Sequence, residues 1–261
     1  MSDVLVLAYH AVSSEWRSPL SVSPDLLEAQ VRRKLEGGYE PVTFTDAVRA
    51  HRAARSGTHR RCGRLLAVTF DDAYASVLTH AQPALERLGA PATVFVPTDH
   101  PARGAPMSWP GIDHWVGTPD EQELMPMSWG QLGGLAARGW EIGSHTCSHP
   151  HLTTLDDADL ARELTVSRAV CERELGRPCT SLAYPYGDFD ERVARAASEA
   201  GYETCATLNA QTQPWDPMQW PRVSVYDVDQ RWRFALKASP TVRRLLASPR
   251  LARARARRSA P

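Results

Sequence analysis

Short apolar runs alternate with amphipathic stretches over most of the chain. The apolar runs have the length of strands, and they lie at residues 4–9, 65–70, 92–97, 140–145 and 180–185. The stretches between them repeat apolar residues at helical spacing and predict helices over residues 24–36, 76–88, 128–138, 156–175 and 190–200. Such alternation is typical of βα units around a parallel sheet, so we expect an α/β protein.

The pattern lapses in two places. Between residues 98 and 127 the content of Pro, Gly and Trp predicts one long loop, and long loops of this kind are usually functional. Residues 241–261 are rich in Arg and contain few large apolar residues. We expect this basic C-terminal tail to be a solvated terminus rather than a binding arm. Residues 1–240 are then expected to form a single domain.

Composition narrows the classes of protein without naming one. The 261 residues include 30 Lys and Arg and 30 Asp and Glu, so no global charge excess draws the chain to nucleic acid or to an acidic membrane surface. We therefore expect no nucleic-acid partner. The cysteines are odd in number, form no C-x-x-C pair, and are expected to be reduced thiols: Cys62, Cys147, Cys171, Cys179 and Cys205.

The beginning of the chain does not have the pattern of a signal peptide. Asp3 stands where Lys or Arg is usual, and the apolar run ends at Tyr9 and His10 after a few residues. No segment reaches the roughly 18 consecutive apolar residues that a membrane span needs. We therefore expect a cytoplasmic location without stable membrane insertion, while the oligomeric state stays open.

Polar residues follow the predicted strands directly. They are Tyr9 and His10, Asp71 and Asp72, Ser144 and His145 with His149, and the segment from Tyr184 to Gly187. The carboxyl ends of parallel strands lie at one face of a barrel or sheet, and active sites of such folds gather there. We therefore expect these residues to converge.

The segment SHTCSHPHL, residues 144–152, has the composition of a metal site. His145 and His149 are four residues apart, and imidazole is a usual ligand for zinc, cobalt, nickel or iron. The segment lacks the Glu of the H-E-x-x-H metalloproteases, which argues against a peptidase. Cys147 is a conceivable ligand, but we expect it to point away from the histidines.

The adjacent carboxylates Asp71 and Asp72 repel each other unless each has its own role. One could coordinate a dication while the other stays free to take a proton from water. The alternative is that one of them caps a helix that begins near Tyr74. A single helix start does not require both carboxylates. A metal ion bound by His145 and His149 would still need a further ligand, and one of the two carboxylates could supply it.

These motifs together resemble the polysaccharide deacetylase family, the NodB-homology domain of carbohydrate esterase family four. TFDDAYAS (residues 69–76), SHTCSHPHL (144–152) and AYPYG (183–187) resemble its ordered motifs, and the likeness extends over about residues 4–226. The resemblance implies a single-domain, distorted (β/α)7-type barrel. Residues 1–240 would then be a deacetylase-like catalytic domain, followed by the basic tail at 241–261.

The resemblance also implies roles for four of the residues above. Asp72, His145 and His149 would bind a divalent metal, zinc in the first place, with cobalt or nickel as alternatives. Asp71 would be the general base that activates metal-bound water. The expected reaction removes N-acetyl groups, or O-acetyl groups, from an amino sugar or glycan precursor, so the expected partner is a carbohydrate substrate.

The third motif implies a substrate-binding segment. The backbone around Tyr186 would help to hold the oxyanion, and Tyr186 with Pro185 would line the groove; the alternative is a turn ordered by Pro185. Indole rings in predicted loops could stack on sugars, although core packing is the more common use of Trp: Trp109, Trp115, Trp129, Trp215 and Trp220.

The sequence departs from the best-known family pattern in two respects. That pattern has an Arg at the position of Ala183 and a late Leu-x-His motif, whereas no histidine follows Gly201. His10 could replace the missing general acid, or it could be a structural histidine at a strand end. Arg222 could replace the missing Arg by pairing with Asp71, or it could be an exposed side chain without a role.

Two other functions stay open. The same metal and base could serve an amidohydrolase that acts on a non-sugar C–N bond. The missing Arg and late His could also mark a carbohydrate-binding relative that has lost catalysis. Four intact acidic and imidazole residues argue against the second alternative, since a binding protein has no evident need for a free base beside a metal.

Overall fold

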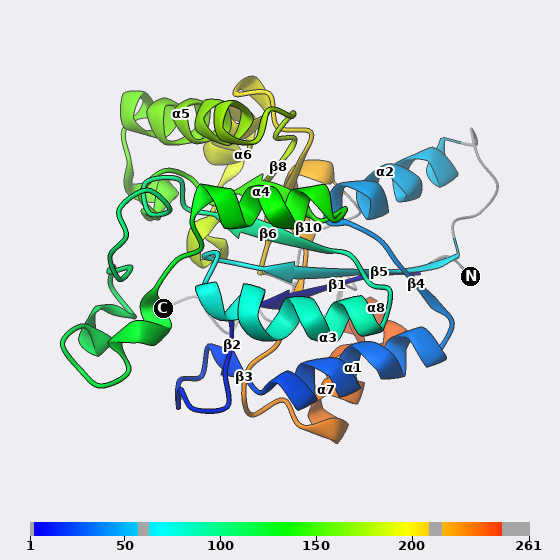
Figure 1. Cartoon of the computed structure of the whole chain (residues 1–261). Helices are drawn as coiled ribbons and strands as arrows, with labels where there is room; N and C mark the ends of the chain where they lie inside the picture. Colours follow the sequence, from blue (N-terminus) through cyan, green and yellow to red (C-terminus); the bar gives the residue numbers. More distant parts are fainter. Residues whose placement is uncertain (1–2, 57–62, 209–215, 247–261) are drawn as a thin grey trace, which may run out of the picture.

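The computed structural model describes residues 3–56, 63–208 and 216–246. Its main element is a nine-stranded parallel sheet that curves into a nearly closed barrel with helices around it (Figure 1). From edge to edge the order is β10 (Trp220–Pro221), β9 (Thr204–Thr207), β8 (Ser181–Ala183), β7 (Glu141–Ser144), β6 (Ala92–Val96), β5 (Arg64–Phe70), β1 (Asp3–Tyr9) and β11 (Val223–Ser224). β4 (Tyr39–Pro41) also pairs with β5, and β2 (Ala11–Val12) pairs with β3 (Ser21–Val22) in a small second sheet.

The α-helices are α1 (Pro24–Glu36), α2 (Phe44–Arg55), α3 (Gln82–Arg87), α4 (Trp129–Ala137), α5 (Asp157–Leu175), α6 (Glu191–Glu199), α7 (Arg231–Lys237) and α8 (Pro240–Leu246). A π-helical turn over Val77–Ala81 precedes α3. Short 3-10 helices lie at Asp113–Trp115, Glu121–Leu124, Leu152–Thr154, Pro185–Gly187 and Pro217–Gln219.

The predicted fold class is confirmed, and the five strongest strand and helix patterns all correspond to elements of the barrel. Ser23 accepts the N–H of Leu26 and Pro24 takes the first helical position, so α1 begins where the sequence indicated. At the other end of such units, α5 stops at Gly176, which adopts a left-handed conformation with φ 64°. The long loop at 98–127 is also present, apart from its two short 3-10 helices.

The sequence analysis did not identify α2, α7, α8 or the short strands β2, β3, β4, β9, β10 and β11. Strands of two to four residues carry too little periodicity to be recognised, and their existence depends on the neighbouring strands that pair with them. α8 crosses the expected boundary at residue 240, and its Arg243 lies 2.6 Å from the Asp3 carboxylate at the start of β1. Residues 247–261 of the expected tail lie outside the described residues.

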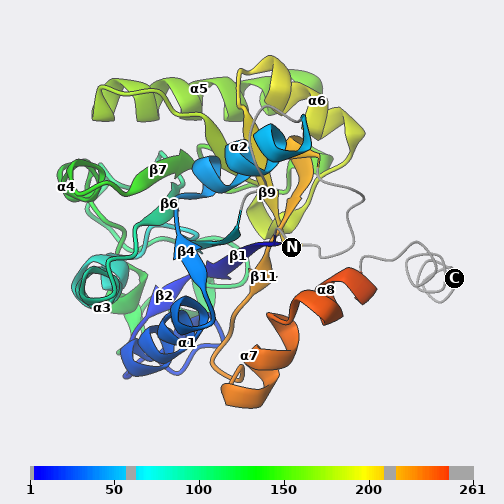
Figure 2. The ribbon, with the colours of Figure 1, turned by 90° about the vertical axis from the view of Figure 1, so that its right-hand side faces the viewer.

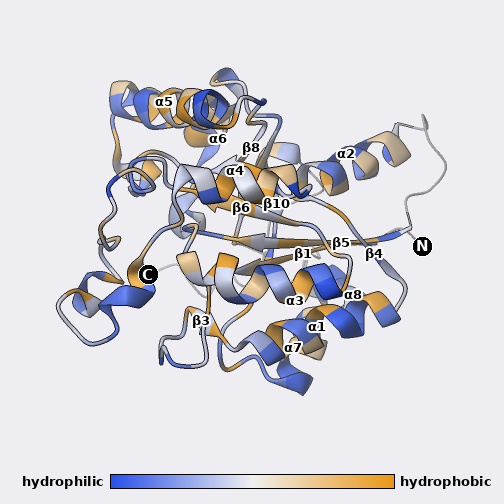
Figure 3. Ribbon diagram, viewed as in Figure 1, coloured by the Kyte–Doolittle hydropathy of each residue, from blue (hydrophilic) through white to orange (hydrophobic). Residues whose placement is uncertain are grey.

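The alternation of side chains along the strands divides the core in two. Leu5, Leu7 and Tyr9 of β1 face the layer beneath the helices, and the middle parts of the central strands are mostly coloured hydrophobic in Figure 3. Val4 and Val6 of the same strand face the inside of the barrel. α2 fills the inside of the barrel at the end where the strands begin. The N–H of Phe44 at its start donates to Thr93 Oγ1, and the N–H of Thr45 donates to the Glu141 carboxylate.

Gly143 shows how tightly the inside of the barrel is packed. A Cβ atom at this position would lie 2.5 Å from Ser181 Oγ and 2.7 Å from the Phe95 ring. The close packing lets β7 run beside β6 and β8, and it places His145 two residues further along on the same inward face.

A single residue connects the two edge strands of the sheet along the chain. β10 pairs with β9 at one edge, β11 pairs with β1 at the other, and only Arg222 separates them in the chain. Arg222 therefore lies where the barrel closes, close to the carboxyl ends of β1 and β5 (Figure 2 shows β11 beside β1).

Candidate active site

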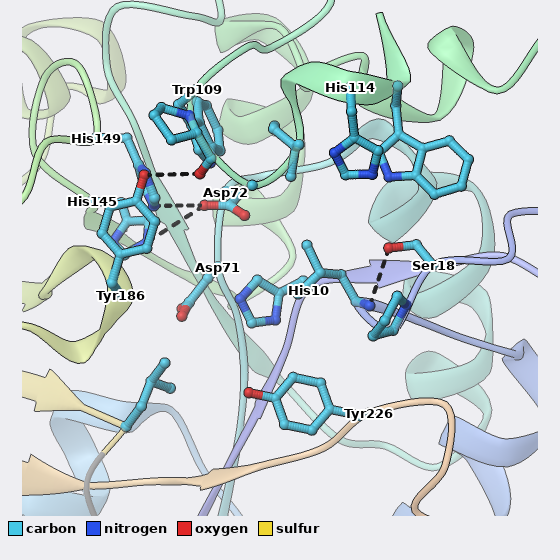
Figure 4. Close-up of a pocket in the computed structure, with 17 residues that line it drawn as sticks. His10, Ser18, Asp71, Asp72, Trp109, His114, His145, His149, Tyr186 and Tyr226 are labelled. Carbon is cyan, nitrogen blue, oxygen red and sulfur yellow. Dashed lines mark hydrogen bonds and ion pairs between the residues drawn. The ribbon is translucent and has the colours of Figure 1, made fainter. Parts of the chain in front are cut away.

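A pocket of about 560 Å³ opens at the carboxyl ends of the strands. Six of the predicted residues line it: His10, Asp71, Asp72, His145, His149 and Tyr186 (Figure 4). The other two predicted residues, Arg222 and Pro185, are buried and do not line the pocket, so Pro185 does not form part of the groove wall as expected. The expected convergence of strand ends therefore brings together residues that span most of the chain.

Asp71 and Asp72 would face opposite sides if β5 simply continued. Asp71 keeps the strand geometry, and its N–H donates to the Tyr9 carbonyl at 2.9 Å. Asp72 and Ala73 then adopt left-handed conformations with φ 68° and 58°, which are unusual for residues other than Gly. This turn breaks the alternation and brings both carboxylates to one pocket. Ala73 is fixed in turn by the long loop, because its carbonyl accepts the N–H of Met127 at 2.8 Å.

Arg222 forms a fork with Asp71 inside the barrel. Its two terminal nitrogens lie 2.6 and 2.8 Å from the two Asp71 oxygens, and one also donates to Thr69 Oγ1 at 3.0 Å. Burial alone would raise the pKa of Asp71, but the Arg222 guanidinium overcomes it and holds the pKa well below its ordinary value. The expected pairing is therefore present, and the alternative of an exposed Arg222 is wrong.

His145 has a defined tautomer. Its Nδ1 lies 2.7 Å from the carbonyl oxygen of Ala183, which can only accept, so Nδ1 carries the proton. The Nε2 of the neutral ring then has a lone pair, and this atom lies 3.5 Å from Asp72 Oδ1. Burial lowers the pKa of His145 to about 4, so the ring is neutral near pH 7.

His149 reaches the same point from a strained loop. Both Thr146 and His149 have positive φ values, 67° and 64°, and the N–H of His149 donates to Thr146 Oγ1 at 3.2 Å. The His149 Nε2 atom lies 3.4 Å from Asp72 Oδ1. Burial, followed by the neighbouring His145, lowers the pKa of His149 well below its ordinary value.

A buried carboxylate on α5 holds this loop in place. Glu163 Oε2 accepts the N–H groups of Cys147 and Ser148 at 2.8 and 3.0 Å, and its Oε1 accepts the Ser148 hydroxyl at 2.8 Å. The sequence analysis missed Glu163, because it lies 14 residues after His149 in the middle of a helix. The same contacts fix the backbone of Cys147, whose thiol donates a hydrogen bond to the Glu163 carbonyl oxygen at 3.5 Å and is not part of the histidine cluster.

Asp72, His145 and His149 fit a divalent metal ion. Their ligand atoms all lie within 4.8 Å of one another, and the distances of 3.4 and 3.5 Å to Asp72 Oδ1 exceed those of hydrogen bonds. Two ligands of a tetrahedral zinc ion, each about 2.0–2.1 Å from it, lie about 3.4 Å apart. Among the described residues, none donates a hydrogen bond to Asp72 Oδ1, although this oxygen is buried. Burial and then the adjacent Asp71 raise the pKa of Asp72 well above its ordinary value, a cost that a bound cation would relieve.

His10 follows β1 directly and lies between Asp71 and Tyr226 in the pocket (Figure 4). Burial lowers the pKa of His10, while the negative charge of Asp71 acts in the opposite direction. Its Nδ1 atom is buried and has no hydrogen-bond partner in the part of the chain that the structure describes.

Tyr186 projects into the pocket from a left-handed backbone position with φ 60°. Its ring stacks on His151 at a centroid distance of 4.0 Å and meets the edge of His149 at 4.6 Å. Its hydroxyl donates to the Pro110 carbonyl of the long loop at 3.4 Å. The AYPYG segment therefore connects the candidate metal centre to the long loop.

The aromatic residues have divided roles. Trp109 lines the pocket and stacks on His149 at 4.3 Å, and Trp115 lines it as well. Trp220 is fully buried inside the barrel, so the hypothesis that it stacks on a sugar is wrong for this residue. Trp129 begins α4 and does not line the pocket, and Trp215 lies outside the described residues.

Several pocket residues escaped the sequence analysis: Ser18, Pro19, Leu20, His114, Leu208 and Tyr226. Tyr226 follows β11 by two residues, so the rule that functional residues follow strands would have identified it had that two-residue strand been recognisable. His114 belongs to the long loop, where no sequence signal separates it from its neighbours.

Two further expectations concern the whole chain. The cysteines that the structure describes, Cys147, Cys171, Cys179 and Cys205, are free thiols, whereas Cys62 lies outside the described residues. Within residues 3–56, 63–208 and 216–246, we find no helix whose length and apolar character would let it cross a membrane.

The fold and the site define a class of protein: a parallel α/β barrel with a candidate Asp-His-His metal centre beside an Arg-bound carboxylate. The sequence model of the family described as polysaccharide deacetylase matches residues 58–205. The chain belongs to this family, which confirms the resemblance seen in its motifs.

Individual relatives agree with this assignment. The chain is 25% identical over 202 residues to YxkH of Bacillus subtilis (strain 168), whose name describes a polysaccharide deacetylase; the match covers 77% of this chain and 63% of YxkH. It is 34% identical over 86 residues to chitin deacetylase 1 of Cryptococcus neoformans, covering 30% of this chain and 18% of that protein. The chain thus spans less than two thirds of the length of these curated relatives.

The barrel also resembles solved structures. The Streptococcus pyogenes deacetylase PplD, solved in complex with acetate, superimposes with a TM-score of 0.73 over 91% of this chain and 98% of that chain, at 20% sequence identity. This likeness supports the fold.

Proposed function

We propose that this protein is a metal-dependent deacetylase that hydrolyses the acetamide of an N-acetylated amino sugar or glycan precursor, with O-acetyl esters as related substrates. The observation that carries the proposal is the division of labour between Asp71 and Asp72. Arg222 keeps Asp71 ionised, while Asp72 shares its pocket with two neutral imidazoles. Membership of the polysaccharide deacetylase family supports the substrate class.

Asp72, His145 and His149 would hold the ion, with zinc as the first choice and cobalt or nickel as alternatives. A divalent ion bound there supplies Lewis acidity, which polarises an acyl carbonyl and makes water a stronger acid. The remaining steps belong to groups of this chain.

Asp71 is the general base. It lines the pocket, and the fork with Arg222 fixes its orientation and keeps it unprotonated. Because its pKa is low, Asp71 is a weak base, and it can deprotonate only a water molecule that is already acidified. This requirement couples the role of Asp71 to the neighbouring Asp-His-His cluster.

His10 is the general acid, and it takes the place of the late histidine that the sequence lacks. A burial-lowered pKa makes its protonated form a strong acid towards a departing amine, and its Nδ1 has no partner among the described residues. The backbone around Tyr186 contributes to the oxyanion site, and the Tyr186 ring forms one wall of the groove for the sugar.

The test is acetate release from a panel of N-acetylated sugars and oligosaccharides by the metal-loaded protein. Asp71→Asn and His10→Gln should each lower kcat at least about 100-fold. His80→Gln, which changes an exposed histidine that does not line the pocket, should leave the rate unchanged. Release of formate or ammonia from non-sugar amides, without release of acetate from sugars, would favour the other amidohydrolase. Sugar binding without any turnover would favour the silent relative.

A further inference from the structure

The charge of the chain is divided unevenly between its two ends. Residues 231–261 contain ten Lys and Arg residues and no Asp or Glu, so the preceding residues carry 20 basic and 30 acidic side chains. The balanced total therefore conceals a strongly basic C-terminal region on an otherwise acidic protein. Such an asymmetry indicates an anionic partner for that region.

Exposed apolar side chains gather in the same part of the chain. Four of the seven large apolar residues that stand exposed among the described residues lie between positions 228 and 245: Val228 (49%), Trp232 (70%), Leu236 (54%) and Leu245 (59%). Trp232 and Leu236 are four residues apart on α7, so they share one face of that helix. An exposed indole beside aliphatic side chains is costly in water and marks an interaction site.

The helices that carry these residues lie at the outer edge of the molecule. Figure 2 shows α7 and α8 beside the barrel, away from α4, α5 and α6. Their inner side is anchored, because Phe234 is buried, Lys237 binds Asp229 at 2.6 Å and Arg243 binds Asp3 at 2.6 Å. The anchored cations are neutralised, whereas Arg231 is exposed next to Trp232.

We propose that α7 and α8, which together contain five Lys and Arg and no Asp or Glu, form a docking surface for an anionic lipid bilayer. Trp and Leu side chains that alternate with Arg are suited to the membrane interface, where the apolar groups enter the acyl boundary and the guanidinium groups bind lipid headgroups. A nucleic acid would satisfy the charge but would not bury Leu236 and Leu245. The surface begins five residues after Tyr226, so docking would hold the pocket close to the bilayer.

Flotation of the full-length chain with lipid vesicles tests this proposal. Vesicles of phosphatidylcholine with about one third phosphatidylglycerol should bind the protein, pure phosphatidylcholine should not, and binding should fall between about 0.05 and 0.5 M salt. Trp232→Ser with Leu236→Ser should weaken the binding at least about tenfold. Replacing Arg231, Arg233 and Arg244 by Gln should weaken it by at least the same factor.

Two matched controls remove the same kinds of side chain elsewhere. Val116→Ser with Val166→Ser changes two other exposed apolar residues, and a second control replaces three exposed arginines by Gln: Arg17, Arg52 and Arg173. Both controls should bind vesicles like the wild type, and thermal unfolding of each variant reports on its folding. The proposal is overturned by absence of vesicle binding. It is equally overturned if Trp232→Ser with Leu236→Ser has no effect while a DNA duplex binds as tightly as the vesicles, since the surface would then be a general polyanion site.

Discussion

Arg222 binds Asp71 through both of its terminal nitrogens, although the two residues are 151 positions apart in the chain. The family pattern places an Arg at the position of Ala183, but this chain delivers the guanidinium from the junction of β10 and β11. Because that junction is where the barrel closes, the same residue connects the two edges of the sheet and fixes the protonation state of the candidate base.

Removing the Arg222 guanidinium should damage both stability and catalysis. In Arg222→Gln the buried Asp71 carboxylate loses its partner, so the free energy of unfolding should fall by about 3–5 kcal/mol. Burial then raises the pKa of Asp71, and the acid limb of the pH–rate profile should move to higher pH. Arg222→Lys should restore part of the activity, and Arg49→Gln, at an exposed ion pair with Glu203, should change neither property. An unshifted acid limb in a folded Arg222→Gln protein would contradict the role assigned to this pair.

Metal content should separate the two adjacent carboxylates. Asp72→Asn, His145→Gln and His149→Gln should each lose bound zinc, because each removes one of three ligand atoms. Asp71→Asn should keep the metal and lose turnover. Inductively coupled plasma analysis after dialysis measures this directly, and loss of metal from Asp71→Asn but not from Asp72→Asn would reverse the two assignments.

Glu163 should affect the metal centre without touching it. In Glu163→Gln the amide replaces a carboxylate that accepts three hydrogen bonds from the loop of Cys147 and Ser148, so the loop that presents His149 is held less firmly. We expect the metal Kd to rise about 10-fold or more. The comparison is Glu174→Gln, an exposed position on the same helix, which should leave the Kd unchanged. A Glu163→Gln protein with unaltered metal affinity would show that the loop is rigid without this carboxylate.

His100 should make the metal-free protein sensitive to acid. Burial lowers the pKa of His100 to about 4, against about 6.5 when unfolded, so the unfolded chain binds more protons between these values. His100 therefore lowers the free energy of unfolding as the pH drops from about 6.5 to 4, by up to about 1.4 kcal/mol per pH unit. Urea unfolding of wild type and His100→Gln across this range should show a smaller slope for the variant. Equal slopes would mean that the pKa of His100 is the same in the folded and the unfolded chain.

Two Gly→Ala substitutions should have opposite effects on stability. Gly143→Ala places a methyl group 2.5 Å from Ser181 Oγ inside the barrel and should cost about 1–3 kcal/mol. Gly133→Ala, in α4 with no atom within 4 Å of the new Cβ, should raise stability by up to about 1 kcal/mol. Denaturant unfolding measures both, and a stable Gly143→Ala protein would show that Phe95 and Ser181 can move aside.

The local patterns of the chain were sufficient for the fold class and for most of the site. Residues that follow a recognisable strand, such as Asp71 and His145, could be placed in advance because parallel strands end at one face. Tyr226 and Glu163 could not, since one follows a two-residue strand and the other lies within a helix. Their roles depend on neighbours that are distant in sequence.

The sequence by itself determined which chemical groups are available: two adjacent carboxylates, two histidines four residues apart and a His at the end of the first strand. The tertiary structure decided how they are used. Left-handed turns at Asp72 and His149 overrule the alternation of the strands, and the closure of the barrel brings Arg222 to Asp71. The physical reason is that protonation and ligand geometry depend on burial and on charges a few ångströms away, and only the folded chain sets those distances.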